Sequence, residues 1–218
     1  MNSECRRLSW IISKFAIASI LGLAIGPPAI TKAQQPDPRQ AMVKELSASG
    51  PHASLGDEAR VFDRLVGTWD CDYGFYAEDG SITHTPGELK FGWIIDGRAI
   101  QDIWITYPTK GSMERGIGTS IRFFDSKSKM WRVVFVSPAY GALVIVQGGA
   151  EGNRIVLRGV DDERSALRWS FNDIQADSFV WRGEKSRDGG ETWRLEEEHR
   201  MTRRTGNAAA NRRATLKN

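Results

Sequence analysis

The sequence of 218 residues is poor in cysteine and histidine, with two of the first and three of the second. Cys5 lies within an N-terminal segment that we expect to be removed, so Cys71 would be the single thiol of the mature chain and no internal disulfide could form. His52, His84 and His199 do not fall at metal-ligand spacing. We therefore predict no protein metal site and a fold stabilised by its apolar core alone.

The apolar segment at residues 15–25 is short for a membrane span, which needs about 20 residues. A polar, basic stretch precedes it, and two prolines and a small-x-small site ending at Ala33 follow it. This order is typical of a secretory signal peptide, residues 1–33, cleaved after Ala33. The mature protein is expected to be exported, to the periplasm or the medium, without a stable membrane span. An uncleaved N-terminal anchor is the alternative.

The excess of basic residues is confined to the two ends of the chain. The whole sequence has a formal net charge of +3, but residues 34–202 hold 21 basic and 26 acidic residues, a net charge of −5. A nucleic-acid-binding domain relies on clustered Lys and Arg facing phosphates, so a nucleic-acid partner is disfavoured. Residues 204–218 are predicted to form a disordered basic tail.

Helical segments are predicted only near the front of the chain. Residues 34–57 are predicted to be a flexible linker, with one or two helical turns at 38–46 that Asp37 can cap. A short amphipathic helix is predicted at 58–65, with Val61, Phe62 and Leu65 on one side. It begins the folded domain, residues 58–203.

After Gly67 the pattern changes to strands separated by turn residues every 8–15 positions. Short loops between consecutive strands specify antiparallel pairing. About ten such strands with one apolar face must close or pack on a second sheet. We therefore predict an all-β fold, an antiparallel up-and-down β-barrel preceded by a short helix. The predicted strands are residues 68–77, 83–93, 98–107, 116–125, 130–137, 142–150, 154–161, 166–172, 178–186 and 192–202.

Aromatic residues alternate with polar ones in several of these strands, which places them on one face. Seven of the eight tryptophans lie in the strand region, Trp193 among them. Inward-pointing rings would either fill a small barrel or line a cavity in a wider one, and the sequence leaves both open. The candidate ligand-binding residues are Tyr73, Phe75, Trp104, Trp131, Trp169 and Trp181.

Three segments carry a resemblance to a known family. Residues 65–69 (LVGTW), directly after the predicted helix, resemble the Gly-x-Trp signature of lipocalin-like calycins. Residues 91–98 (FGWIIDGR) and 120–125 (SIRFFD) are similar to an uncharacterised bacterial group within that set. The resemblance covers nearly all of the predicted domain. It implies a barrel pocket for a small, largely apolar molecule, structural roles for Gly67 and Trp69, and an arginine of the last strand, Arg200 or Arg203, packed against Trp69.

Residues 186–193 (SRDGGETW) are similar to the Asp-box of sialidase propellers. A propeller needs several four-stranded blades, and neither the length nor a repeat supports one. We interpret the segment as a tight hairpin, in which Asp188 accepts backbone N–H groups and Trp193 packs beneath the turn.

Chemistry-bearing residues are few. No Ser-His-Asp order, phosphate-binding loop or dinucleotide fingerprint is present. The candidates for acid–base catalysis are Asp102, Glu197 and His199. His199 is also a candidate haem ligand, because some calycin-like barrels resemble haem-binding nitrobindins; otherwise no cofactor is predicted.

The leading hypothesis is an exported, lipocalin-like barrel, monomeric or weakly oligomeric, that binds a small apolar molecule. Whether it is an enzyme stays open. The alternatives are an enzyme using the same cavity for acid–base chemistry on a small hydrophobic substrate, a haem protein, and a structural domain with a filled core.

Overall fold

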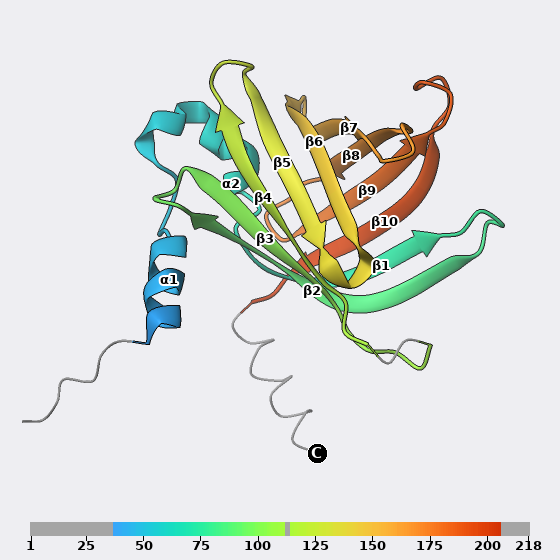
Figure 1. Cartoon of the computed structure of the whole chain (residues 1–218), viewed down its shortest axis with the longest axis horizontal. Helices are drawn as coiled ribbons and strands as arrows, with labels where there is room; N and C mark the ends of the chain where they lie inside the picture. Colours follow the sequence, from blue (N-terminus) through green and yellow to red (C-terminus); the bar gives the residue numbers. More distant parts are fainter. Residues whose placement is uncertain (1–36, 112–113, 206–218) are drawn as a thin grey trace, which may run out of the picture. The chain divides into compact units, whose positions relative to one another are not determined.

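The computed structural model describes residues 37–111 and 114–205 (Figure 1). The predicted signal peptide and nearly all of the predicted basic tail lie outside these residues. Within the two described ranges, no helix has the length and apolar character needed to cross a membrane.

Ten antiparallel strands form a closed barrel, which confirms the predicted fold (Figure 1). Each strand pairs with the next along the chain, and β1 pairs with β10 to close the ring. The strands are β1 (Gly67–Tyr76), β2 (Ile82–Ile94), β3 (Ala99–Thr106), β4 (Ile117–Asp125), β5 (Met130–Ser137), β6 (Ala142–Glu151), β7 (Arg154–Val160), β8 (Ala166–Asn172), β9 (Ser178–Ser186) and β10 (Arg194–Arg203). All ten lie within two residues of their predicted bounds.

The segment before the barrel is helical in three short pieces. Helix α1 (Pro38–Leu46) is capped by Asp37, whose carboxylate accepts a hydrogen bond from the backbone of Arg39. A 3₁₀ segment, η1 (Ala53–Ala59), then leads into α2 (Arg60–Asp63). The predicted helix at 58–65 is therefore shorter than expected. A further 3₁₀ turn, η2 (Pro138–Tyr140), lies between β5 and β6.

One end of the barrel, which we call the base, is filled by side chains from α2 and the first strand. The Phe62 ring packs edge-on against Trp131, with ring centres 4.9 Å apart, and against Phe171 at 5.9 Å. The indole Nε1 of Trp69 donates to the carbonyl of Leu65, just after α2, at 2.8 Å. Phe62, Leu65, Trp69 and Trp131 are completely buried. The base therefore has the packed core that one reading of the aromatic pattern predicted.

An arginine does pack on Trp69, but it is Arg203. The Arg203 guanidinium lies 4.0 Å from the Trp69 ring centre, whereas Arg200 is two-thirds exposed and paired with Glu198. Of the two candidates, Arg200 does not take this position: Arg203 lies directly opposite Trp69 in the register, so their side chains share a face, whereas Arg200 pairs with Asp72 and points outward. Gly67 has a φ of +134°, and a Cβ there would lie 2.6 Å from Arg203 Nη1, so glycine is required beside this contact.

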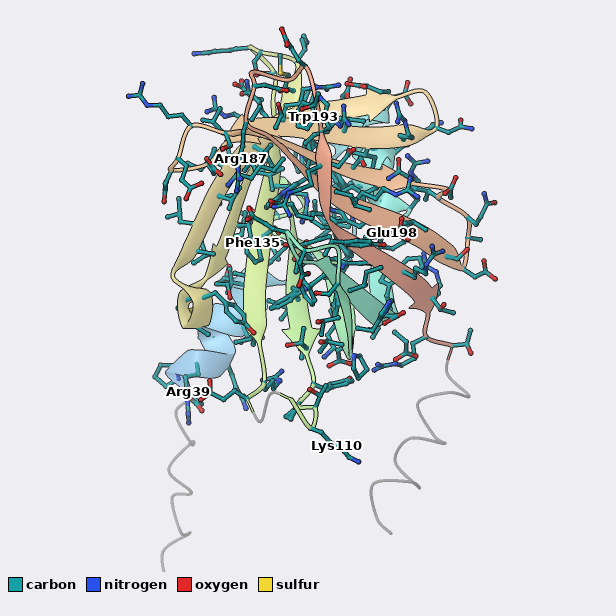
Figure 2. The ribbon with its side chains drawn as sticks, turned by 90° about the vertical axis from the view of Figure 1, so that its right-hand side faces the viewer. Arg39, Lys110, Phe135, Arg187, Trp193 and Glu198 are labelled. Atoms are coloured by element: carbon teal, nitrogen blue, oxygen red, sulfur yellow. The ribbon has the colours of Figure 1, made fainter. Side chains whose placement is uncertain are left out.

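A β-bulge in β10 corrects a second expectation. The register with β9 shifts between Leu195 and Glu197, which reverses the faces of the residues before it. Trp193 therefore does not join the interior aromatics. It lies at the turn from β9 to β10 (Figure 2), as the Asp-box-like segment predicted, with its ring 4.1 Å from the guanidinium carbon of Arg168 and its Nε1 donating to the carbonyl of Gly190.

Candidate functional site

A cavity of about 540 Å³ occupies the half of the barrel away from the base. The register defines its position: Trp69 pairs with Arg203 at the base, whereas Phe75 pairs with Glu197 near the other end, and both of these line the cavity. Residues of the first strand, the last strand and most of the strands between them contribute to the wall. The barrel is thus filled in one half and hollow in the other.

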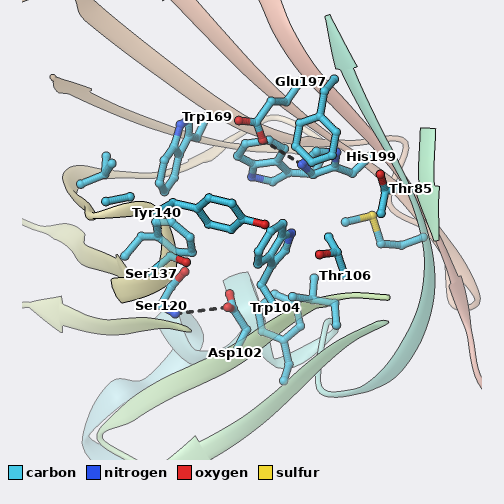
Figure 3. Close-up of a pocket in the computed structure, with 18 of the residues that line it drawn as sticks. Thr85, Asp102, Trp104, Thr106, Ser120, Ser137, Tyr140, Trp169, Glu197 and His199 are labelled. Carbon is cyan, nitrogen blue, oxygen red and sulfur yellow. Dashed lines mark hydrogen bonds and ion pairs between the residues drawn. The ribbon is translucent and has the colours of Figure 1, made fainter. Parts of the chain in front are cut away.

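The wall of the cavity is mainly aromatic (Figure 3). Trp169 packs edge-on against Trp181 at 5.6 Å and against Phe135 at 6.0 Å. Trp104 lies on the opposite side, and Tyr140 of η2 reaches across the cavity toward it, with ring centres 6.1 Å apart. Flat rings held by their neighbours provide apolar surface without rearrangement.

The six predicted ligand-binding residues divide into two groups. Phe75, Trp104, Trp169 and Trp181 line the cavity. The remaining two, Tyr73 and Trp131, are completely buried in packed side chains and do not line it. The Tyr73 hydroxyl donates to the carbonyl of Glu88 at 2.9 Å, and burial raises the pKa of Tyr73.

His199 and Glu197 form a polar pair on this aromatic wall. His199 Nε2 lies 2.9 Å from Glu197 Oε2, and the imidazole stacks on Trp181 at 4.8 Å with an interplanar angle of 13°. The edges of Tyr73 and Phe75 flank it at 4.8 and 5.5 Å. His199 is buried, while the Glu197 side chain is 40% exposed. A proton can move between such a carboxylate and an imidazole, so the pair has the composition of an acid–base centre.

Asp102, the third catalytic candidate, belongs to a buried ion pair. Its Oδ2 lies 2.5 Å from Arg122 Nη2, and the side chains of Asp102 and Arg122 are 5% and 4% exposed. Its Oδ1 accepts from the backbone N–H of Ser120 at 3.2 Å (Figure 3). Both carboxylate oxygens are therefore engaged within the protein, which argues for a structural role. Among the described residues, no hydrogen bond or ion pair joins Asp102 to the Glu197–His199 pair.

Sequence reasoning missed Arg122 and Tyr140. Arg122 alternates with Ile121 and Phe123, and such a pattern predicts an outward arginine; instead Arg122 is 3% exposed and Phe123 is 49% exposed. The available signal was Asp102, a buried-face carboxylate on the neighbouring strand that needs a cation. Tyr140 lies between the predicted strands 130–137 and 142–150, where the sequence predicts only a turn.

Comparisons with known proteins define the fold. No protein family matches the sequence, and no curated protein matches it. Among solved structures, the S-type phycobiliprotein lyase CPES from Guillardia theta is similar with a TM-score of 0.50 and 10% identity, over 67% of this chain and 92% of that one. Rv2717c from M. tuberculosis is similar with a TM-score of 0.52 and 15% identity, over 71% of this chain and 99% of that one. At this level of identity the comparison shows a shared fold, and in this chain that fold is a closed, ten-stranded antiparallel barrel.

Proposed function

We propose that this protein binds a small, largely apolar molecule in the barrel cavity. The observation that carries the proposal is the cavity itself, with its wall of Phe75, Phe135, Trp104, Trp169 and Trp181 beside a fully packed base. A domain with a purely structural role would gain stability by filling this volume, because voids cost packing free energy. Membership of the uncharacterised bacterial lipocalin-like group, on segments 65–69, 91–98 and 120–125, is part of the proposal.

The size of the cavity suits a compact organic molecule. Burying roughly 300 Å² of apolar ligand surface at about 25 cal/mol per Å² contributes about 7.5 kcal/mol before ordering costs. A Kd of 1 μM corresponds to about 8 kcal/mol, so burial on this scale supports binding in the micromolar range or weaker. The shared calycin-like fold supports a ligand-binding barrel but does not name the ligand.

Binding of N-phenyl-1-naphthylamine, an uncharged fluorescent probe, tests the proposal. We expect saturable fluorescence enhancement with a micromolar Kd for the wild-type protein. Val144→Trp, which adds an indole to the cavity wall, should weaken binding at least about tenfold. The matched control is Ile145→Trp on the same strand, because Ile145 is 56% exposed on the opposite face, and it should bind as wild type does. Linear, unsaturable enhancement, or equal loss in both variants, would reject the cavity as the site.

The natural ligand is best sought by native mass spectrometry of protein taken directly from its host. A reproducible mass increment that Val144→Trp lacks would identify a bound molecule. The same spectra report the oligomeric state, for which we propose a monomer or weak oligomer.

Export is a separate part of the proposal and rests on the sequence of residues 1–33. We propose cleavage after Ala33 and release into the periplasm or the medium. Cell fractionation and intact-mass measurement of the product test it, since the mature chain would begin at Gln34. A cytoplasmic protein of full-length mass would contradict it, and a full-length, membrane-bound one would favour the uncleaved anchor.

The Glu197–His199 pair favours one alternative, an enzyme that uses the cavity for acid–base chemistry on a small hydrophobic substrate. Once a ligand is known, incubation followed by product analysis tests this. Turnover by the wild-type protein that His199→Gln abolishes, with ligand binding retained, would establish the enzyme. Unchanged ligand after prolonged incubation would favour simple binding.

Haem ligation by His199 is a further alternative that the present arrangement does not favour. The Nε2 atom contacts Glu197, so iron bound there would have to displace this carboxylate, and the Nδ1 atom is completely buried. The residues as placed do not fit an axial ligand. Titration with haem gives the direct answer, because a Soret band that is lost in His199→Ala would reverse this conclusion.

A further inference from the structure

The inner end of the cavity contains an arginine with unused hydrogen-bond donors. Arg122 lines the cavity and is 3% exposed. Of its three guanidinium nitrogens, Nη2 contacts Asp102, whereas Nε and Nη1 are buried without a hydrogen-bond partner. Buried N–H groups are nearly always paired, so two unpaired nitrogens on one charged side chain require an explanation.

Aromatic rings surround the guanidinium but do not supply the missing acceptors. Its central carbon lies 5.3 Å from the ring centre of Phe62, 5.2 Å from that of Phe91 and 5.9 Å from that of Phe171. Ring faces stabilise the positive charge, but they do not replace an oxygen in the plane of the N–H groups. None of the described residues accepts these hydrogen bonds, and Arg122 lines the cavity, so the cavity is the place from which an acceptor can come.

Charge decides what kind of acceptor fits. The positive charge of Arg122 is already balanced by Asp102 at 2.5 Å. The other acidic residues of the cavity wall, Glu114 and Glu197, add negative charge. A ligand carboxylate would bring a further anion into a poorly solvated space that lacks a matching cation, which is costly. An uncharged oxygen can accept the same hydrogen bonds without that cost.

We propose that the ligand carries a carbonyl oxygen, as in a ketone, ester, amide or quinone, and that this oxygen points inward and accepts hydrogen bonds from Arg122. The inference rests on the proposed function and defines the ligand class for the same cavity. The remainder of the ligand packs on the aromatic wall. Hydrocarbons and carboxylic acids of the same size bind less tightly.

Three naphthalene probes of closely similar size separate these classes. They are the ketone 2-acetyl-6-(dimethylamino)naphthalene, its oxygen-free parent 2-isopropenyl-6-(dimethylamino)naphthalene, in which a CH2 group replaces the carbonyl oxygen, and the carboxylate 6-(dimethylamino)-2-naphthoate. We expect the ketone to bind the wild-type protein about tenfold more tightly than the parent, in line with a hydrogen bond from a charged donor. The carboxylate should bind more weakly than the ketone.

The matched variants are two charge-neutral double substitutions. Arg122→Met with Asp102→Asn removes the ion pair in the cavity, and the ketone preference should fall to about onefold. Arg168→Met with Glu184→Gln removes a comparable pair, held by two contacts of 2.7 Å on the other face of the sheet, and the preference should persist. Thermal unfolding checks that both variants are folded.

A second measurement needs only the wild-type protein. The infrared C=O stretch of the ¹³C-labelled ketone should move to lower frequency than in an aprotic apolar solvent, because a hydrogen bond weakens the C=O bond. An unshifted band would overturn the inference, as would equal affinity for ketone and parent, which would mean that water satisfies Arg122. Tightest binding of the carboxylate would also overturn it, in favour of an anionic ligand. Failure of all three probes to bind would instead reject the proposed function itself, and this inference with it.

Discussion

The guanidinium of Arg203 covers the indole of Trp69 and at the same time hydrogen-bonds three backbone carbonyls, those of Arg64, Val66 and Ala176, at 2.8, 2.6 and 2.6 Å. These carbonyls belong to the residues that follow α2 and to the loop before β9. One side chain of the last strand therefore connects the end of α2 to the base of the barrel. Cations are favoured at such carbonyl-rich helix ends.

Arg203→Ala should lower the free energy of unfolding by about 2–3 kcal/mol, because it removes charged hydrogen bonds and a cation–π contact together. Arg200→Ala, which changes a two-thirds exposed side chain three residues earlier, should change it by less than about 0.5 kcal/mol. Urea denaturation of the two variants measures both values. Equal destabilisation would contradict the assignment of Arg203 as the closing arginine.

The buried Arg122–Asp102 pair should show strong coupling. Arg122→Met alone leaves a buried carboxylate without its cation, and we expect a loss of about 3–5 kcal/mol in stability. Adding Asp102→Asn should recover part of that loss, since no charge then stays buried. A double-mutant cycle by denaturant unfolding gives the coupling energy. Strictly additive losses would show that the two groups do not interact.

Cys71 should be unreactive in the folded protein. It is 7% exposed, and burial raises the pKa of its thiol to about 12, so almost no thiolate exists at pH 8. In a Cys5→Ser variant of the whole chain, 5,5′-dithiobis(2-nitrobenzoate) should label Cys71 only as fast as the protein unfolds. Rapid stoichiometric labelling without denaturant would contradict this burial.

Asp188 should make the β9–β10 turn sensitive to acid. Hydrogen bonds from the Thr192 side chain, from the Thr192 backbone and from Ser186 lower the pKa of Asp188. Because the folded pKa lies below the unfolded one, its stabilising contribution is present above the unfolded value and is lost as pH falls through the folded value. Asp188→Asn should therefore lower Tm at pH 7, and the difference from wild type should shrink below about pH 4.

Thermal unfolding between pH 7 and pH 2 provides the measurement. Asp162→Asn, at an exposed turn between β7 and β8, is the control and should leave the pH profile unchanged. A constant Tm difference between wild type and Asp188→Asn across this range would mean that the hairpin does not depend on ionised Asp188.

The fold was predictable because apolar and polar residues alternate with a period of two in β-strands. Alternation and turn residues placed ten strands and the short linker helix, and together they required closure. The same periodicity failed at the bulge after Leu195, where one extra residue turned Trp193 to the outside. The Asp-box-like segment gave the correct placement of Trp193, because it predicted this residue beneath the turn.

The site was less predictable, for two physical reasons. Alternation gives the face of a residue but not its depth along the barrel, so Trp131 in the packed base and Trp169 on the cavity wall look alike in sequence. A charged residue is also wrongly predicted to face outward when its ion-pair partner lies on a neighbouring strand. Arg122 is interior only because Asp102 lies near it, and that partnership depends on the register.

The packed base determines the direction from which a ligand could reach the cavity. Because Phe62 and its neighbours fill the base, the ligand that we propose would enter and leave through the opposite end of the barrel. If its carbonyl oxygen lies innermost, at Arg122, the other end of the proposed ligand lies at the opening, beside the exposed residues Tyr140 and Glu114. A protein that accepts the proposed ligand from this barrel would therefore contact its outer end first.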